Sequence, residues 1–315
     1  MRVLVLGAGV IGSVYAGRLL EAGHEVILVA RGKRLEDLAA HGLILRDAES
    51  GQRLQMPVVA VSQPDPCTHF DLVLVAVRAE QLQDTLPVVT AMTDGSDVLF
   101  FGNTAGRQTA LVDALGQRAV FGFPAVGGTR DGPSVTYVAI AQQKTMLGEP
   151  SGLRTPRARR LHELLDGAGF PTQISPDIDA WLVGHAAFVV PIAFALYRVE
   201  VDASRLATDR ATMSLMVNGT RQGFTALRSC GNTQIPANLR ALYRLPNMLV
   251  IAYWARVLAG PRGELWFAAH TRTARDEMHT LAQHLHTAIR ATGRPTPDLD
   301  QLLNNAPEPP TAPSS

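Results

Sequence analysis

A glycine-rich turn near the start of the chain constrains its fold more than any other stretch. The apolar run at 2–6 predicts a strand that is buried on both faces of a parallel sheet. An amphipathic helix is expected over 10–22, and a second strand over 25–30. The turn between the first strand and this helix contains Gly7, Ala8, Gly9, Val10, Ile11 and Gly12.

Each of the three glycines in this turn has a mechanical reason. Gly7 allows the tight turn out of the strand, Gly9 lets the backbone approach a pyrophosphate, and Gly12 lets the helix pack closely on the strand. The helix N-terminus offers amide N–H groups and a positive dipole end to an anion. Because a strand precedes the motif and a helix follows it, the turn predicts a dinucleotide site. The alternative is a tight strand-to-helix connection without a ligand.

The residue after the second strand indicates which dinucleotide is bound. NAD sites place Asp or Glu there for the ribose 2′-hydroxyl, whereas this chain has Arg31, with Lys33 and Arg34 close behind. A guanidinium pairs with a 2′-phosphate through two hydrogen bonds, and a carboxylate repels it. The sequence therefore predicts NADP(H) as the cofactor. The alternative is a solvated basic turn.

Two further polar side chains follow predicted strands. Arg78 comes after a doubly buried strand at 70–77, and Asn103 after a strand at 97–101. Ligands of open α/β sheets bind beyond the carboxyl ends of the strands, so both residues are site candidates. The amide of Asn103 can bond a carbonyl oxygen and a ribose hydroxyl. The alternative for both is turn chemistry, since Asn caps helices and Arg side chains reach from strand ends into water.

The sequence pattern changes near residue 177. Before it, strands alternate with helices. After it, apolar residues recur at helical spacing, and the predicted helices include 206–227, 239–258 and 265–289. The predicted domains are an NADP-binding domain of the α/β Rossmann type (1–176), an all-helical substrate or dimerisation domain (177–303) and a disordered tail (304–315).

The stretch just before the boundary predicts three smaller features of the first domain. A Gly-rich segment at 127–132 reads as a turn. Antiparallel strands are expected at 134–140 and 144–147, and an edge strand at 171–174.

Composition excludes several classes of protein. Hydrophobic residues make up 46% of the chain and the net charge is +1, which does not suit a disordered chain or a nucleic-acid-binding tail. Cys67 and Cys230 have no metal-site spacing, so no metal is predicted and a reducing cytoplasm fits. A signal peptide is not expected. The apolar stretch 180–196 contains His185 and Pro191 and is shorter than the roughly 20 residues of a membrane span, so a buried helix of a soluble domain is expected.

Residues 1 to about 300 resemble the ketopantoate reductase family. The resemblance rests on the glycine turn, the strand exits at Arg78 and Asn103, the Pro176–Asp177 boundary and the helical second half. It implies a Rossmann-type domain followed by a helical domain like that of 6-phosphogluconate dehydrogenase, and the NADPH-dependent carbonyl reduction of 2-dehydropantoate 2-reductase. The cofactor-contacting residues of the family fall on Arg31, Arg78, Asn103, Gly128 and Glu277.

The helical half departs from the family pattern. The family opens this domain with a Trp-x-Lys motif, whose lysine protonates the substrate carbonyl, and two asparagines follow to hold the substrate. Trp181 is retained here, but the lysine position is Val183 and the asparagine positions are Ala187 and Pro191. The serine that holds the substrate carboxylate falls at about Leu265. A substrate with more hydrocarbon than ketopantoate is therefore expected.

Two histidines are candidates for the missing proton donor. His185 is the only titratable side chain inside the apolar helix at 180–197. His270 precedes Glu277 by seven residues, which would place both on one face of a continuous helix. An imidazole can donate a proton near neutral pH. The alternatives are a hydrogen-bonded core histidine at 185 and a solvated pair at 270 and 277.

The sequence thus predicts a cytoplasmic NADPH-dependent oxidoreductase that reduces a small 2-oxo acid or a related ketone. Asn103, His185 and His270 are its predicted catalytic residues. A small-molecule substrate is the expected partner, with neither nucleic acid nor membrane, and a homodimer through the helical domain is a further expectation. Two other functions stay open: a non-catalytic NADP(H)-responsive binding protein, and an imine reductase like the opine dehydrogenases, whose protonated substrate needs no lysine.

Overall fold

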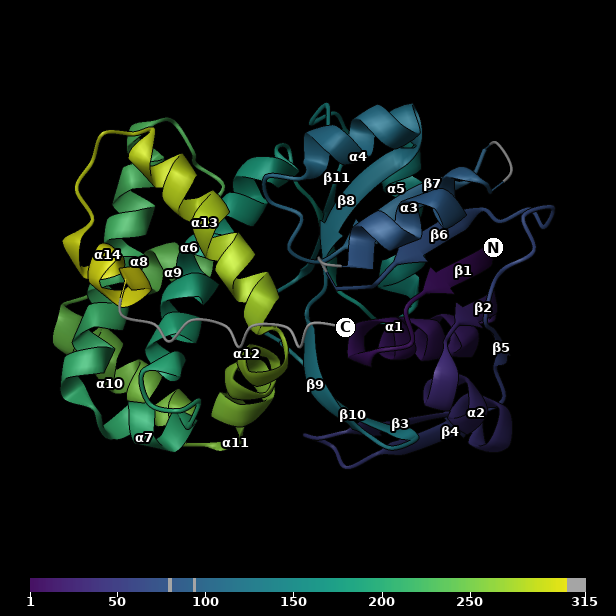
Figure 1. The fold of residues 1–315 in the computed structure, drawn as a ribbon, viewed down its shortest axis with the longest axis horizontal. Coiled ribbons are helices and arrows are strands. Elements are labelled where there is room, and N and C mark those ends of the chain that lie inside the picture. Colours follow the sequence, from purple (N-terminus) through teal and green to yellow (C-terminus); the bar gives the residue numbers. More distant parts are fainter. Residues whose placement is uncertain (79–80, 93–94, 305–315) are drawn as a thin grey trace, which may run out of the picture. The chain divides into compact units, whose positions relative to one another are not determined.

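The computed structural model describes residues 1–78, 81–92 and 95–304 and divides into two compact units, residues 1–179 and residue 180 onward (Figure 1). This division falls in the first turn of helix α6 (Ile178–Tyr197), whereas the sequence placed the boundary just before it. Asn304, the first residue of the predicted tail, ends a helix. The rest of the predicted tail lies outside the described residues.

The first unit is built on an eight-stranded sheet in the order β12-β11-β8-β7-β6-β1-β2-β5. The six strands from β8 to β5 are parallel, and β11 pairs antiparallel with β8. The order reverses beside β1, because the chain crosses from β5 at one edge to β6 on the other side of β1. The strands are β1 (Arg2–Leu6), β2 (Glu25–Val29), β5 (Val59–Val61), β6 (Leu72–Val75), β7 (Asp97–Phe101), β8 (Ala119–Phe123), β11 (Thr145–Gly148) and β12 (Thr172–Ile174).

Helix α1 (Val10–Glu21) is buried between this sheet and a second, smaller one. Val5 of β1 and Leu45 of the smaller sheet belong to the same hydrophobic core as the inner residues of α1. Gly17 of α1 faces the smaller sheet, where a Cβ would lie 2.5 Å from the Leu45 side chain. The remaining α-helices of the unit are α2 (Gly32–His41), α3 (Leu82–Thr90), α4 (Gln108–Leu115) and α5 (Pro156–Gly167).

The smaller sheet corrects two predictions. Its order is β4-β3-β10-β9, with bounds Leu43–Asp47 (β3), Arg53–Met56 (β4), Val126–Asp131 (β9) and Ser134–Ala139 (β10). The predicted turn at 127–132 is wrong in its extent, because Gly127 and Gly128 lie in strand β9 and the chain turns only at Gly132, where φ is +52°. Strands β10 and β11 do not pair with each other: β10 pairs with β9 and β3, and β11 pairs with β8 and β12.

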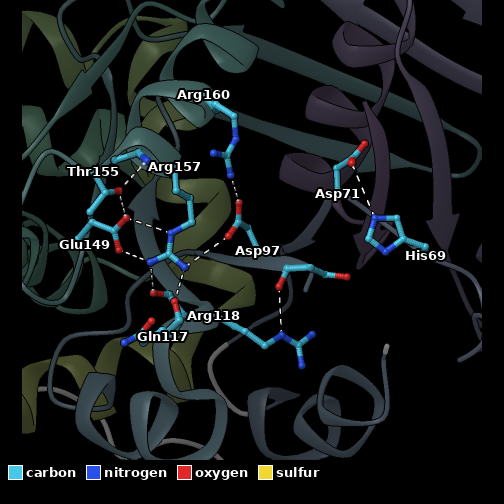
Figure 2. Close-up of polar contacts among 12 residues, drawn as sticks. His69, Asp71, Asp97, Gln117, Arg118, Glu149, Thr155, Arg157 and Arg160 are labelled. Atoms are coloured by element: carbon cyan, nitrogen blue, oxygen red, sulfur yellow. Dashed lines mark hydrogen bonds and ion pairs between the residues drawn. The ribbon is translucent and has the colours of Figure 1, made fainter. Parts of the chain in front are cut away.

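A buried ionic network lies where β7 and β8 begin (Figure 2). Arg157 in the first turn of α5 bonds the Glu149 carboxylate through Nε (3.0 Å) and Nη2, and its Nη1 lies 3.4 Å from Oδ1 of Asp97. Thr155, the N-cap of α5, donates its hydroxyl to Glu149 as well. Arg160 reaches the other oxygen of Asp97 at 3.2 Å from an exposed position. The network joins α5 to the beginnings of the parallel strands, at the end of the sheet opposite the glycine turn.

The described part of the second unit is helical, but its helices are shorter than predicted. Asp209 caps α8 by accepting a hydrogen bond from the Thr212 amide (3.0 Å), Pro246 precedes α10, and Ala274 breaks the last predicted helix at φ −119° and ψ 41°. After α6 the elements are α7 (Ala203–Thr208), α8 (Arg210–Ser229), α9 (Ala237–Leu242), α10 (Asn247–Leu258), α11 (Pro261–Gly263), the π-helical η3 (Glu264–Ala268), α12 (Ala269–Thr273), α13 (Arg275–Arg290) and α14 (Pro297–Asn304).

Helix α6 has 20 residues, more than the apolar stretch from which it was predicted. By length and composition alone it could cross a membrane, but 83% of its most apolar window is buried inside the protein. Its side chains therefore contribute to the protein core.

Candidate functional site

Four neighbouring parallel strands end at one edge of the main sheet, and a predicted site residue follows each of them. In the spatial order β2, β1, β6 and β7, these are Arg31, the glycine turn, Arg78 and Asn103. At a spacing of about 4.8 Å between strands, the row extends over roughly 14 Å. It includes the point where the strand order reverses, which is where open α/β sheets bind their ligands.

The backbone of the turn accounts for its three glycines. Gly7 has a φ of +104°, and a Cβ there would lie 2.6 Å from the Ala76 carbonyl oxygen. A Cβ on Gly12 would lie 1.8 Å from the Gly7 carbonyl oxygen. Around Gly9, by contrast, a Cβ would meet no described atom within 4 Å, and the residue is exposed. The geometry thus shows a tight turn at Gly7, open space at Gly9 and close packing at Gly12, as predicted.

The first turn of α1 has the properties of an anion site. Gly9 is its N-cap, and the turn contains no acidic residue. The first hydrogen bond within the helix runs from the Ser13 amide to the Gly9 carbonyl (3.0 Å), so the amides of Val10, Ile11 and Gly12 have no acceptor inside the helix. These amides and the helix dipole favour a phosphate beside Gly9.

Arg31 lies just beyond β2 as the N-cap of α2, with its side chain exposed. Among the described residues, no carboxylate forms an ion pair with it. Lys33, in contrast, pairs with Glu36 at 3.4 Å and with Asp37 at 3.2 Å. Of these two predicted basic residues, Arg31 is therefore the one whose charge is available to a ligand.

Arg34 does not belong to a solvated basic turn. It is only 7% exposed, and it donates from Nε to the Ala8 carbonyl (3.1 Å), from Nη1 to the Pro133 carbonyl (2.9 Å) and from Nη2 to the Ser13 hydroxyl (3.0 Å). Burial, and then repulsion by Arg130, lowers the pKa of its guanidinium. Sequence reasoning missed this role because Pro133, in the turn between β9 and β10, is remote in the chain.

The other predicted residues of the first unit differ in their surroundings. Arg78 is exposed, and its backbone N–H donates to the Gln81 side chain (3.3 Å). Asn103 is half-buried after Gly102. Gly128 lies inside β9, where a Cβ would be 2.3 Å from the Thr136 carbonyl oxygen of β10. Close strand pairing is thus a sufficient reason for glycine at this position.

His185 is a core residue. It is 4% exposed, its ring stacks on Trp181 with centroids 5.1 Å apart, and it meets the edge of Phe188 at 6.2 Å. Burial lowers the pKa of His185 to about 3, so its imidazole is neutral at pH 7. The prediction of a proton donor assumed an ordinary imidazole pKa, and this environment does not provide one.

His270 and Glu277 are close together although the predicted continuous helix between them is broken. His270 ends up in α12 and Glu277 in the first turn of α13, with Ala274 between the two helices. The His270 Nε2 atom lies 3.9 Å from Oε1 of Glu277. The imidazole is 52% exposed and the carboxylate 8%, so one member of the pair reaches water and the other is held inside the protein.

Apolar packing occupies the positions where the resemblance expected substrate-binding side chains. Ala187 and Pro191 are buried, and a Cβ on Gly223 of α8 would lie 3.4 Å from that of Ala187. Val183 and Leu265 are half-buried. These side chains offer neither a cation nor a hydroxyl to a substrate.

A cavity of about 320 Å³ lies elsewhere in the helical unit, and none of the predicted site residues lines it. Its lining residues are Asn218, Arg221, Gln222, Thr225, Ala226, Arg294 and Pro295. Within the described ranges, His, Cys, Asp and Glu side chains form no group of three or more that could hold a metal ion.

Comparison with known proteins finds a family match within the first unit. Residues 3–152 match the family described as ketopantoate reductase PanE/ApbA. A 2-dehydropantoate 2-reductase from Mesorhizobium japonicum is 30% identical over 217 residues, which cover 60% of this chain and 65% of that protein. The chain matches 58 to 65% of the length of the first curated relatives.

Solved structures share the fold of nearly the whole chain. The 2-dehydropantoate 2-reductase from Geobacter metallireducens GS-15 has a TM-score of 0.81 at 16% identity, covering 96% of this chain and 98% of that one. D-mandelate dehydrogenase, solved with NADH and anilino(oxo)acetate, has a TM-score of 0.73 at 18% identity, covering 96% of each chain. These likenesses show an α/β Rossmann-like sheet with a helical C-terminal part. Residues 3–152, which contain the glycine turn and the Arg31, Arg78 and Asn103 strand exits, are a domain of the ketopantoate reductase (PanE/ApbA) family.

Proposed function

We propose that this protein is an NADPH-dependent oxidoreductase that reduces the carbonyl of a small 2-oxo acid or a related ketone, with a preference for a substrate other than ketopantoate. The row of strand exits that sets the glycine turn between Arg31 and the Arg78 and Asn103 exits carries this proposal. The family domain supports it, as do relatives named 2-dehydropantoate 2-reductase and the fold shared with D-mandelate dehydrogenase.

The residues of the first unit fit NADP(H). The space at Gly9 and the first-turn amides of α1 suit the pyrophosphate, and the exposed guanidinium of Arg31 suits the 2′-phosphate. Arg78 and Asn103 follow the strands at the other end of the row, where they would hold the nicotinamide ribose and the substrate carbonyl. The cofactor, when bound, supplies a hydride from the nicotinamide ring.

Proton delivery to the carbonyl oxygen falls to this chain's own side chains. We assign it to His270, because its imidazole reaches water while the Glu277 carboxylate, 3.9 Å away, can fix its orientation. We do not assign this role to His185, because burial lowers its pKa to about 3 and its ring packs against Trp181 and Phe188. Gly128 and Glu277 remain proposed contacts of the cofactor.

The substrate class follows from side chains that the helical unit lacks. Val183 stands where the family has a lysine, and Leu265 where it has a serine that holds the carboxylate. Replacement of an ammonium and a hydroxyl by hydrocarbon removes polar recognition and favours apolar substituents on the substrate. We therefore propose 2-oxo acids or ketones with a larger apolar group than ketopantoate carries.

The test is turnover of purified protein with NADPH and a panel of 2-oxo acids, ketones and imines, followed by the absorbance of NADPH. Oxidation with an apolar 2-oxo acid or ketone, faster than with ketopantoate, is the expected result. Tight NADPH binding without oxidation on any substrate supports a non-catalytic NADP(H)-responsive protein instead. Oxidation with imines alone supports an enzyme that resembles the opine dehydrogenases.

A further inference from the structure

We infer that Arg34 is a positioning residue for cofactor binding, which fixes the direction of the Gly9 amide and puts a buried positive charge next to the glycine turn. This inference rests on the proposed dinucleotide site at residues 7–12. It gives a role to a residue that the glycine motif does not include.

The guanidinium of Arg34 joins three segments of the first unit. It donates to the Ala8 carbonyl in the turn, to the Ser13 hydroxyl in α1 and to the Pro133 carbonyl between β9 and β10. The Ser13 hydroxyl in turn donates to the same Ala8 carbonyl at 3.2 Å. The Ala8 carbonyl oxygen therefore accepts two hydrogen bonds from one buried cluster, and Ser13 is fully buried.

This anchoring of one carbonyl determines where the next amide points. The peptide between Ala8 and Gly9 is trans, so its C=O and N–H point in opposite directions. Because the C=O points toward Arg34 and Ser13, the Gly9 N–H points away from them. In the described part of the chain no residue accepts a hydrogen bond from this N–H, and Gly9 is exposed. Arg34 thus holds a backbone donor in the direction from which a phosphate can approach.

The positive charge of Arg34 also favours a phosphate beside the glycine turn. The negative charge of Asp37 favours the protonated form of Arg34, but Asp37 forms its ion pair with Lys33. A guanidinium stays protonated in proteins. A buried charge is screened less by salt than an exposed one, so its field extends to the turn that begins at Ala8. A phosphate beside Gly9 would gain from this field in addition to the helix dipole.

Arg31 and Arg34 divide the recognition of the cofactor between them. Arg31 is the exposed N-cap of α2, and Arg34 lies in the first turn of this helix, buried against the glycine turn. Arg31 would contact only the 2′-phosphate that distinguishes NADPH from NADH. Arg34 acts through the pyrophosphate loop, which both dinucleotides share. Loss of Arg34 should therefore weaken both dinucleotides by the same factor.

Isothermal titration calorimetry of the full chain with NADPH, NADH and adenosine 2′-monophosphate tests this inference. The third ligand carries the 2′-phosphate but lacks a pyrophosphate. In each of the variants Arg34→Gln and Arg34→Lys, the dissociation constants of the two dinucleotides should rise by the same factor, about tenfold or more. Gln loses the charge-assisted bond to Ala8, and Lys loses the fork-shaped donor geometry of the guanidinium. Ser13→Ala should raise both to a smaller extent. Binding of adenosine 2′-monophosphate should not change.

The matched control is Arg130→Gln, which removes an exposed positive charge whose field reaches Arg34 but which bonds only the Gly132 carbonyl among described residues. It should leave all three affinities within about twofold. Unchanged dinucleotide affinities in folded Arg34→Lys and Ser13→Ala overturn the inference. Wild-type affinity for both dinucleotides in Arg34→Lys, with weaker binding in Arg34→Gln, also overturns it, because the positive charge alone would then suffice. Equal loss for all three ligands means general damage to the domain and contradicts a positioning role.

Failure of the proposed site itself gives a different result. If the wild-type protein binds none of the three ligands, the dinucleotide site is wrong irrespective of Arg34.

Discussion

Removal of the Arg157 side chain is expected to destabilise the first unit strongly. The side chain is 18% exposed, and the carboxylate of its partner Glu149 is 3% exposed. Arg157→Met keeps most of the aliphatic volume and removes the charge, which leaves Glu149 buried with the Thr155 hydroxyl as a remaining donor. Breaking a buried ion pair by removal of one partner costs about 3–5 kcal/mol. Burial raises the pKa of Asp97, and the charge of Arg157 opposes this rise. The variant therefore also removes a cation that stabilises the Asp97 carboxylate.

Circular dichroism during heating measures this effect. A loss of 1 kcal/mol lowers the melting temperature of a domain of this size by about 2–4 °C. Arg157→Met should therefore lower the melting temperature of the first unit by on the order of 10 °C. Arg160→Met is the matched control, because Arg160 lies on the same helix and contacts the same Asp97 at 3.2 Å while 58% exposed. An exposed pair contributes up to about 1 kcal/mol, which corresponds to roughly 4 °C or less.

A second substitution separates the charge from the packing. Adding Glu149→Gln to Arg157→Met removes the unpaired buried carboxylate and should restore a large part of the lost stability. Similar small shifts for Arg157→Met and Arg160→Met, or no recovery in the double variant, would refute the reasoning.

The glycine turn and the histidines give three further predictions. Gly9→Ala should leave the melting temperature unchanged and lower the affinity for NADPH in calorimetry. Gly12→Ala should lower both the melting temperature and the affinity, since its Cβ would lie 1.8 Å from a carbonyl oxygen. Equal melting temperatures of the two variants would contradict this. Because burial lowers the pKa of His185 from 6.5 to about 3, stability should be full above pH 6.5 and fall toward pH 3. His185→Leu should remove about 1.4 kcal/mol of this loss per pH unit, and an unchanged pH dependence of melting argues against it. His270→Gln should lower kcat on a discovered substrate about a hundredfold at unchanged NADPH affinity, with a smaller loss for Glu277→Gln; full turnover in both places the donor elsewhere.

Features that depend on a few adjacent residues could be predicted from the sequence. The strand at 2–6, the turn at Gly7 to Gly12 and the second strand follow from apolar periodicity and from glycine sterics, and the structure has them within one residue of the expected bounds. The exits at Arg78 and Asn103 followed from parallel strands that end at one edge.

Features that depend on packing between distant segments could not be predicted. The glycines at 127–132 carry a turn signal, but Gly127 and Gly128 lie in a strand of a sheet that β10 completes by pairing with β3, a segment far away in the sequence. Desolvation of His185 requires the aromatic rings around it, and the burial of Arg34 requires the turn at Pro133. The contact of His270 with Glu277 was expected on a continuous helix, and it exists across a break at Ala274 that no local residue signals.

The central claim is that the glycine turn and Arg31 bind NADPH, and calorimetry of the wild-type protein and Arg31→Ala with NADPH and NADH tests it most directly. Loss of a charged hydrogen-bonded contact corresponds to about 1.5–3 kcal/mol, so NADPH should bind roughly 10- to 150-fold more weakly to Arg31→Ala while NADH affinity stays the same. Because Arg31 is exposed, the effect should shrink as salt is added. Equal weakening of both dinucleotides, or no measurable affinity of the wild-type protein for either, would contradict the claim.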